Sequence, residues 1–527
     1  MKYNKIRHLG LFFLLPLALQ GCTDWNDHYN DEQNVIAENT LWEEIELRPD
    51  LGEFRSLLER YGYKEILDGS QMFTVFAPIG PIDTGSSDEK IKSEVIENHI
   101  ARFVHSANNA INEKSEVVML NTKVINLVQD GNTYKFGDNR FTNEYNIRAK
   151  NGVLHVIEGQ QMYFHNIWEY LTTDDRFSNI RNFLYSFNDT ILNENKSVKG
   201  DINENGQQEY LDSVVYIQNP LLYSIGELNN EDSTYTMIVP TNKAWDSAYS
   251  RIATYYKDYP TSIPWHKRDS MQRVYTQIGI VRDLVFSHTV QESVSDSLKS
   301  TTGGIFKKPF EYILSDYSDW NQSISCSNGG IFVVDSLKHN PWDSWHTPIK
   351  IEAENSNVLD EARTTGSVVY RRTLSSADTL YRKVSGGAYL EVVPTSPTAK
   401  PKLVFNVWNT LQGQYDVKIV FLPQTRTTSK KAPKPNLFDV SYSSIPSTGE
   451  WPSTLTSTFV ELDLTNNTLT KMDTVIVGTI KPERCTYGTE YIGLKLILDS
   501  SYSDLNVNST TFLIDCIILE PHNPSKE

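Results

Sequence analysis

Three histidines are of the residue type that acid–base catalysts and metal sites use most. His99, His155 and His288 could each titrate near neutral pH or bind a metal through a ring nitrogen. Each stands in an apolar or strand-like run, with no other His, Cys or carboxylate at ligand spacing. Because such a centre needs several donors on one atom, the sequence favours structural histidines.

A polar stretch offers a second kind of chemistry. Asp201, Asn203 and Asn205 precede Gly206, as alternate oxygen ligands precede the sharp glycine turn of a calcium loop. The twelfth position of that pattern has no glutamate. The sequence therefore favours a plain exposed loop over residues 193–208 rather than a calcium site.

Enzyme signatures are absent from the sequence. There is no nucleophile elbow, zinc-protease helix, phosphate loop or dinucleotide fingerprint. We therefore expect a protein that is not an enzyme. A glycosidase-type carboxylate pair among the 66 acidic residues is the alternative.

The N-terminal segment predicts export. Lys2, Lys5 and Arg7 precede an apolar run over residues 9–19, which is shorter than the about 20 residues of a membrane span. Gly21-Cys22 at its end resembles the lipobox of bacterial lipoproteins. The resemblance implies a signal peptide over residues 1–21, acyl lipid on Cys22 and a lipidated tether over residues 22–35.

Charge limits the partners. The net charge of −17 becomes −20 once the three basic residues of the signal segment are removed. Such an acidic chain repels nucleic acid and anionic headgroups, so membrane attachment must come from the acyl chains. Three other cysteines remain, Cys326, Cys485 and Cys516. Cys485 and Cys516 either pair or stay free as small buried hydrophobes.

An imperfect internal repeat organises the first two thirds of the chain. Residues 73–78 (FTVFAP) recur as residues 235–240 (YTMIVP), and the Asn-Gly turn with an apolar strand over 151–158 recurs over 328–335. Both pairs resemble the two signature boxes of the fasciclin (FAS1) family. The resemblance implies two α/β fasciclin-like domains, over residues 36–170 and 171–345, that mediate adhesion or protein contacts. The first copy has Ile79-Gly80-Pro81 where the family has Thr-Asn, so the helix that follows is expected to be displaced.

Beyond residue 345 short β runs separated by Ser, Thr, Pro and Gly predict an all-β sandwich. The opening IEAE (residues 351–354), the Gly386-Gly387-Ala388-Tyr389 segment and the closing strand with Asp515 resemble carbohydrate-binding modules of families 6 and 35. The resemblance implies a jelly roll over residues 346–527 and a structural calcium held by Glu352, Glu354 and Asp515. Three buried carboxylates without a cation would cost too much, so either a cation is bound or some of them face solvent.

The sugar-binding residues are less defined. Stacking aromatics are candidates by residue type alone: Tyr370, Tyr381, Trp408 and Trp451. A basic loop over residues 425–435 contains Arg426, Lys430, Lys431 and Lys434 and either binds an anionic ligand or is merely solvated.

The expected whole is a multidomain surface lipoprotein of the outer membrane, of the kind found in Bacteroidota. Two functions follow from the resemblances. The first is a non-catalytic accessory of a glycan-uptake system that binds glycan or the uptake proteins. The alternative is an adhesion or protein-interaction scaffold without sugar binding.

Overall fold

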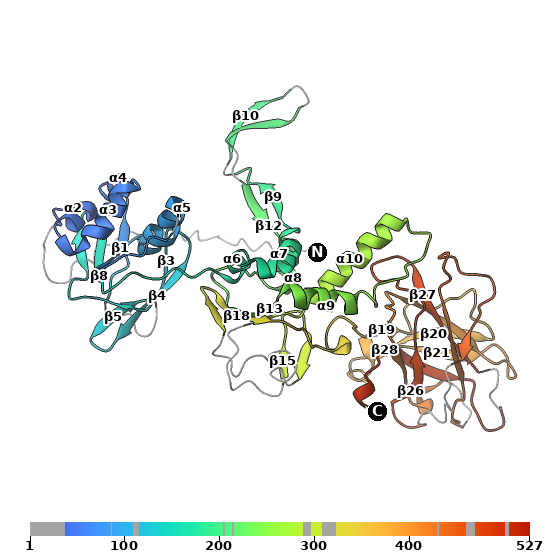
Figure 1. Cartoon of the computed structure of the whole chain (residues 1–527). Helices are drawn as coiled ribbons and strands as arrows, with labels where there is room; N and C mark the ends of the chain where they lie inside the picture. The colour runs from blue at the N-terminus through green and yellow to red at the C-terminus, as the bar shows by residue number, and fades with distance from the viewer. Residues whose placement is uncertain are drawn as a thin grey trace, which may run out of the picture. The chain divides into compact units, whose positions relative to one another are not determined.

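The computed structural model describes residues 37–526 except 86, 109–114, 196, 204–205, 213–214, 288–296, 308–322, 429–431, 460–468 and 501–504. The chain forms two compact units, residues 1–163 and 164–527 (Figure 1). Within the described ranges, no helix is long and apolar enough to cross a membrane. Cys22, Asn205, His288, Lys430 and Lys431 lie outside the described residues, so the predictions for them stay predictions.

Unit 1 is an α/β module in which short helices pack on a small mixed sheet. Its helical segments are α2 (Leu41–Glu46), η1 (Pro49–Leu51), α3 (Gly52–Arg60), α4 (Tyr63–Leu67), α5 (Asp88–Lys90), η2 (Ile91–Ile96) and η3 (Glu97–His99). The main sheet has the order β2-β1-β8-β7, built from β1 (Phe73–Pro78), β2 (Ile100–Arg102), β7 (Ile147–Ala149) and β8 (Gly152–Ile157). A second, antiparallel sheet consists of β3 (Ser115–Val118), β4 (Val124–Asp130), β5 (Thr133–Phe136) and β6 (Asn139–Arg140).

The second α/β module, at the start of unit 2, repeats this sheet. Its order is β14-β13-β18-β17, built from β13 (Tyr235–Pro240), β14 (Val285–Ser287), β17 (Ile324–Cys326) and β18 (Gly329–Val334). Its helical segments are α6 (Ile167–Tyr170), η4 (Asp175–Phe177), α7 (Ser178–Tyr185), α8 (Pro220–Ile225), α9 (Asn242–Ile252), α10 (Trp265–Val281) and η6 (Pro341–Asp343). A small hairpin joins β15 (Ser297–Lys299) to β16 (Ile305–Lys307).

The strand registers confirm the predicted duplication. In both modules the two repeated segments are the central parallel pair, with Phe73 opposite Gly152 in one and Tyr235 opposite Gly329 in the other. These glycines have φ of 149° and 138°, and a Cβ at either would overlap the carbonyl oxygen of the facing residue. Glycine is therefore required where the second strand of each pair begins.

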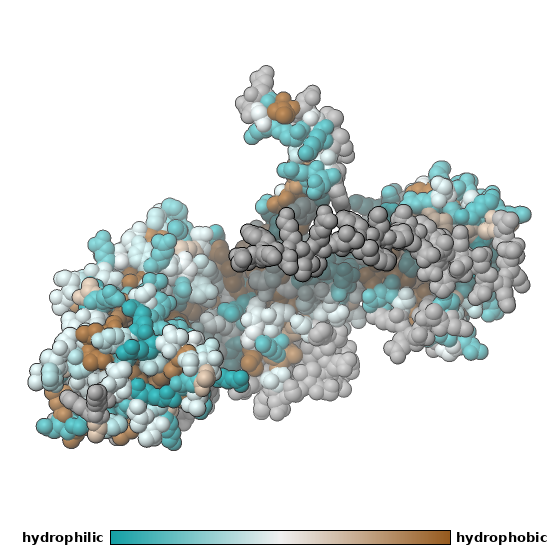
Figure 2. All heavy atoms as spheres, turned by 180° about the vertical axis from the view of Figure 1, so that it is seen from behind, coloured by the Kyte–Doolittle hydropathy of each residue, from teal (hydrophilic) through white to brown (hydrophobic). Residues whose placement is uncertain are grey.

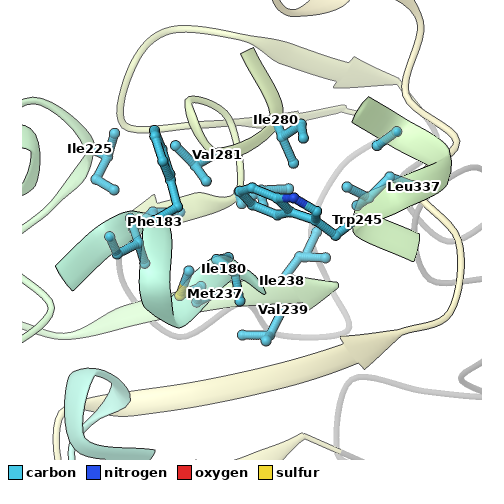
Figure 3. Packing of buried hydrophobic residues seen from close by; sticks show 14 of the residues in the cluster. Ile180, Phe183, Ile225, Met237, Ile238, Val239, Trp245, Ile280, Val281 and Leu337 are labelled. Atoms are coloured by element: carbon cyan, nitrogen blue, oxygen red, sulfur yellow. The ribbon is translucent and has the colours of Figure 1, made fainter. Parts of the chain in front are cut away.

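Helices of the second module pack their apolar side chains into one core with the sheet. Phe183 of α7 and Trp245 of α9, with ring centroids 5.8 Å apart, share one core with Ile238 of β13 (Figure 3). The helix expected to be displaced in the first copy does not follow β1 directly, since the described residues 79–85 and 87 that lead to α5 are not helical. In the second copy α9 begins at once, because Thr241 Oγ1 accepts a hydrogen bond from Ala244 N and caps it.

A β arm replaces the plain loop expected over residues 193–208, and that prediction is wrong. The arm contains two antiparallel pairs: β9 (Asp189–Leu192) with β12 (Val215–Gln218), and β10 (Val198–Ile202) with β11 (Gln208–Asp212). Gly206, at a φ of 78°, supplies the turn at the tip, where Gly206 N donates to Asn203 O. Figure 1 shows the arm leaving the module, and Figure 2 shows apolar atoms on it.

The third part of the chain is an all-β sandwich, as predicted. One sheet has the order β20-β21-β28-β23-β26 with β19 also paired to β28, and the other has the order β22-β27-β24-β25. The strands of the first sheet are β19 (Ile349–Glu352), β20 (Ser367–Thr373), β21 (Ala388–Pro394), β23 (Tyr415–Phe421), β26 (Asp473–Ile480) and β28 (Phe512–Pro521). Those of the second are β22 (Lys402–Trp408), β24 (Asp439–Ser444), β25 (Thr458–Phe459) and β27 (Ile492–Asp499). Three 3-10 turns complete it: η7 (Ser385–Gly387), η8 (Gln424–Arg426) and η9 (Pro524–Lys526).

Within unit 2 the sandwich and the second α/β module share buried contacts. Leu411 and Cys485 of the sandwich belong to the same apolar cluster as the helices α7, α9 and α10. Tyr259 Oη donates to Tyr487 O at 3.2 Å, and Ser262 Oγ donates to Tyr491 Oη at 2.8 Å. Residues 164–170 group with this unit, whereas the sequence places the boundary at 170/171.

Candidate cation and ligand sites

Of the three candidate histidines, the two that the structure describes, His99 and His155, have structural roles, as predicted. His99 Nδ1 donates to Val95 O at 2.6 Å, and its Nε2 accepts from Gln161 N at 2.9 Å. His155 Nε2 donates to His105 O at 2.8 Å, and its Nδ1 accepts from Asn146 N at 3.3 Å. Burial lowers the pKa of both rings to about 4. With both nitrogens engaged and the rings neutral, neither is placed to bind a metal or transfer a proton.

A cluster of possible metal ligands lies where the first and last strands of the sandwich meet. Glu352 at the end of β19 faces Cys516 of β28, and Asp515 precedes it. One ligand atom from each of these three side chains lies within 4.8 Å of the others. Among the described residues, this is the one group of three or more His, Cys, Asp or Glu side chains whose ligand atoms lie within that distance of one another.

A β-bulge brings Asp515 and Cys516 to the same site. Two steps along β23, from Ile419 to Phe421, correspond to three steps along β28, so two residues of β28 oppose one of β23. Such a bulge redirects side chains that would otherwise alternate between the two faces. The flanking Ile514 and Ile517 remain in the sandwich core. Because sequence spacing alone assigns neighbouring residues to opposite faces, Cys516 is the ligand that the sequence analysis missed.

The hydrogen bonds around the cluster leave part of each carboxylate free. Ser385 donates through its N–H to Asp515 Oδ1 at 2.9 Å and through its hydroxyl to Glu352 Oε1 at 2.6 Å. Lys350 Nζ lies 3.1 Å from the same Glu352 oxygen. Glu352 Oε2 and Glu354 Oε2 are both buried without a hydrogen-bond partner in the described structure.

The electrostatics favour a bound cation. Burial raises the pKa of Asp515 to about 6, and the neighbouring carboxylates Glu352 and Glu354 add to the rise against the lowering effects of Ser385 N–H and Lys350. Burial also raises the pKa of Glu354. A divalent cation in the cluster would favour the charged form of Asp515 and give Glu352 Oε2 a partner, so Glu352 and Asp515 fit a cation. Glu354 is not part of the 4.8 Å cluster, which Cys516 completes instead.

A cavity of about 430 Å³ adjoins this cluster. Its lining includes Trp408, three asparagines (Asn355, Asn406 and Asn409) and Glu352. In binding sites, amide groups orient the polar atoms of a ligand and an aromatic ring packs against its apolar face. The cavity is large enough for a small ligand.

The other candidate aromatics have different surroundings. Trp451 donates Nε1–H to Ile492 O at 3.3 Å, and its ring lies 5.0 Å from Lys495 Nζ. Tyr370, 42% exposed, packs with Arg372, and Tyr381 packs on Gly387. None of these three lines the Trp408 cavity. Of the four aromatics chosen by type, the structure therefore places Trp408 at a concave surface beside polar groups.

The described basic residues of the loop over 425–435 are paired. Arg426 Nη1 lies 2.8 Å from Asp378 Oδ2, and Lys434 Nζ donates to Asn506 O at 2.8 Å. Lys434 borders a second cavity, of about 510 Å³, at the loop end of the sandwich. Arg426 is therefore ion-paired, whereas Lys434 is held by a backbone carbonyl oxygen.

The three described cysteines are not cross-linked. Cys326, Cys485 and Cys516 form no disulfide. The sequence left open whether Cys485 and Cys516 form a disulfide or stay separate. In the structure they are separate buried thiols.

Comparison with known proteins gives matches among solved structures. No family model and no curated protein matches the chain. A FAS1 domain pair from the insect cell adhesion molecule fasciclin I matches at 17% identity, covering 56% of this chain and 98% of its own, with a TM-score of 0.21. A family 35 carbohydrate-binding module from Clostridium thermocellum matches at 10% identity, covering 33% and 99%, with a TM-score of 0.19.

A Podospora anserina GH26-CBM35 β-(1,4)-mannanase matches at 15% identity over 34% of this chain, with a TM-score of 0.19. The match spans 28% of the mannanase. Structures similar to this chain thus include both domain types that the sequence resembles. At these identities and TM-scores the likenesses carry no argument about what the chain does.

Proposed function

We propose that the protein binds glycan through the cavity beside Trp408, as a non-catalytic accessory of a glycan-uptake system at the outer membrane. The observation that carries the proposal is the lining of this cavity, which brings Trp408 together with three asparagines. A sugar presents an apolar face to an aromatic ring and hydroxyl groups to amides. In this proposal the sandwich is a carbohydrate-binding-module-like jelly roll, and the two fasciclin-like modules act as a stalk or docking piece.

Replacing Trp408 with alanine is expected to remove glycan binding. Loss of a central aromatic contact costs about 2 kcal/mol or more, which is about 30-fold in affinity. A glycan array probed with the full chain identifies a ligand, and titration calorimetry then compares the variants. Tyr370→Ala, an exposed aromatic of the same sandwich that does not line the cavity, is the matched control. Equal binding by Trp408→Ala and the wild type would move the site elsewhere.

The proposed location rests on the N-terminal sequence. Lipid on Cys22 would anchor an acidic chain whose described helices include none able to cross a membrane. Cys22→Ala is therefore expected to shift the protein from the membrane pellet to the soluble fraction. Membrane fractionation with washes that strip peripheral proteins measures this, and a variant that still pellets would contradict the anchor.

One observation favours the alternative, a protein-interaction or adhesion scaffold. The β arm exposes Ile202, Val215, Tyr216 and Ile217, at 49–69% of their surfaces. A two-stranded ribbon is marginally stable alone in water, and exposed apolar side chains on it suit a protein contact. If the array retains no glycan, this second function becomes the better one.

A further inference from the structure

We propose that Glu352, Asp515 and Cys516 form a site for a borderline-soft divalent cation of the Zn²⁺ type, bound through two carboxylate oxygens and a thiolate. The three side chains present ligand atoms within 4.8 Å of one another. This proposal is independent of glycan binding and differs from the all-oxygen calcium site expected from the sequence.

The thiol is the observation that points to a ligand. Cys516 is 3% exposed and forms no disulfide. No residue of the described chain donates to or accepts from its sulfur. Cys516 directly follows Asp515, and in a regular strand the two side chains would point to opposite faces of the sheet. The bulge in β28 instead turns the Cys516 thiol toward Glu352 and Asp515. Two carboxylates close together therefore share their site with a buried sulfur donor.

The number and type of available donor atoms fit the coordination shell of Zn²⁺ better than that of Ca²⁺. Ser385 occupies one oxygen of Asp515 and one of Glu352. Glu352 Oε2 is buried without a hydrogen-bond partner in the described structure. The oxygen of Asp515 that Ser385 does not occupy and Cys516 Sγ are the other donors that the cluster offers. Zn²⁺ takes four ligands from sulfur, nitrogen and oxygen donors, so these three and a water complete its shell. Calcium takes six to eight oxygens and does not use thiolate.

The position of the cluster gives the bound ion a structural consequence. Glu352 ends the first strand of the sandwich, and Asp515 and Cys516 lie in the last strand. An ion held by all three ties the two strands together and stabilises the folded state, because the unfolded chain does not hold the ligands together.

Binding of Zn²⁺, Cd²⁺ and Ca²⁺ to the full chain tests the proposal. A Cys22→Ala background limits the thiols to Cys326, Cys485 and Cys516. We expect one Zn²⁺ per chain by titration calorimetry, with affinity at least 10-fold above that for Ca²⁺, and a rise in the melting temperature of unit 2. Cd²⁺ should give an ultraviolet sulfur-to-metal charge-transfer band.

Cys516→Ser is expected to lose the Cd²⁺ band and at least 10-fold in Zn²⁺ affinity, whereas the matched control Cys326→Ser keeps both. Melting of each variant in chelator shows whether it folds. If Cys516→Ser does not fold, Asp515→Asn, which keeps the thiol, must weaken Zn²⁺ binding by at least 10-fold. Absence of a Cd²⁺ band in the wild type, tighter binding of Ca²⁺ than Zn²⁺, or unchanged Zn²⁺ affinity in the folded Cys516→Ser or Asp515→Asn variant would each overturn the proposal.

Discussion

Asn328→Ala is expected to destabilise unit 2, and Asn151→Ala to destabilise unit 1 in the same way. Each asparagine is 2% exposed and precedes the second strand of the repeated parallel pair. Asn328 Oδ1 accepts from Ile167 N, the first residue of α6, at 2.9 Å. Its Nδ2 donates to the carbonyl oxygens of Leu228 and Asn230 at 2.8 and 3.0 Å.

Asn151 repeats the arrangement in unit 1. Its Oδ1 accepts from Leu41 N, the first residue of α2, at 2.8 Å, and its Nδ2 donates to Leu67 O and Gly69 O, both at 2.7 Å. Alanine removes three hydrogen bonds to backbone groups in each case, although Leu228 O keeps the one that it accepts from Trp168 N. At about 1–3 kcal/mol for each buried unsatisfied group, the expected loss is about 3 kcal/mol or more.

Calorimetry of the full chain measures the two effects separately, provided that the units melt in resolved transitions. The smaller unit 1 should melt roughly 6–12 °C lower with Asn151→Ala, and the larger unit 2 should shift less with Asn328→Ala. Asn143→Ala and Asn357→Ala, at exposed positions of the two units, are the matched controls. Shifts no larger than those of the controls would show that these asparagines do not hold the first helix to the sheet.

These two asparagines also show what a single sequence can predict. The Asn-Gly pair before an apolar strand was recognisable in both copies. The glycine is required by a positive φ, and the asparagine side chain accepts a hydrogen bond from the first backbone N–H of a helix. The strands of the sandwich were likewise recognisable, as short β runs between Ser, Thr, Pro and Gly. What unites them is that each feature is encoded within a short segment.

The failures involve features that no local apolar pattern marks. The polar run over 193–208 carries no apolar alternation strong enough to predict strands, yet the arm pairs β10 with β11. Cys516 reaches the cation site through a bulge opposite β23, which no spacing within β28 reveals. Trp408 could not be separated from Trp451 by residue type, since the difference lies in which polar groups surround each ring.

Asp360→Ala is expected to cost the sandwich about 3–5 kcal/mol, the usual penalty for breaking one buried ion pair from one side. Asp360 Oδ2 lies 2.5 Å from Lys495 Nζ and 3.0 Å from Arg363 Nη1. The Asp360 and Lys495 side chains are 10% and 3% exposed. Removing the carboxylate leaves the ammonium of Lys495 buried with Asn406 Oδ1, 2.7 Å away, as its remaining hydrogen-bond acceptor in the described structure.

The double variant Asp360→Leu with Lys495→Met separates the pair's net value from the cost of breaking it. Burial alone would raise the pKa of Asp360, but Lys495 and then Arg363 lower it below the ordinary value near 3.8. A carboxyl with a lowered pKa stabilises the fold above its unfolded pKa, and that contribution is lost as pH falls through the folded pKa.

Wild-type unit 2 should therefore lose this contribution below about pH 4, whereas the double variant should lack that part of the acid sensitivity. Urea denaturation at neutral pH is expected to place the double variant close to the wild type, because apolar replacement of a buried pair is often neutral. Asp360→Ala should stand well below both. Equal stability of Asp360→Ala and the wild type would mean that Lys495 reaches solvent or another acceptor once its partner is gone. The buried ion pair would then have no role in holding β22 and β27 against the segment that contains Asp360.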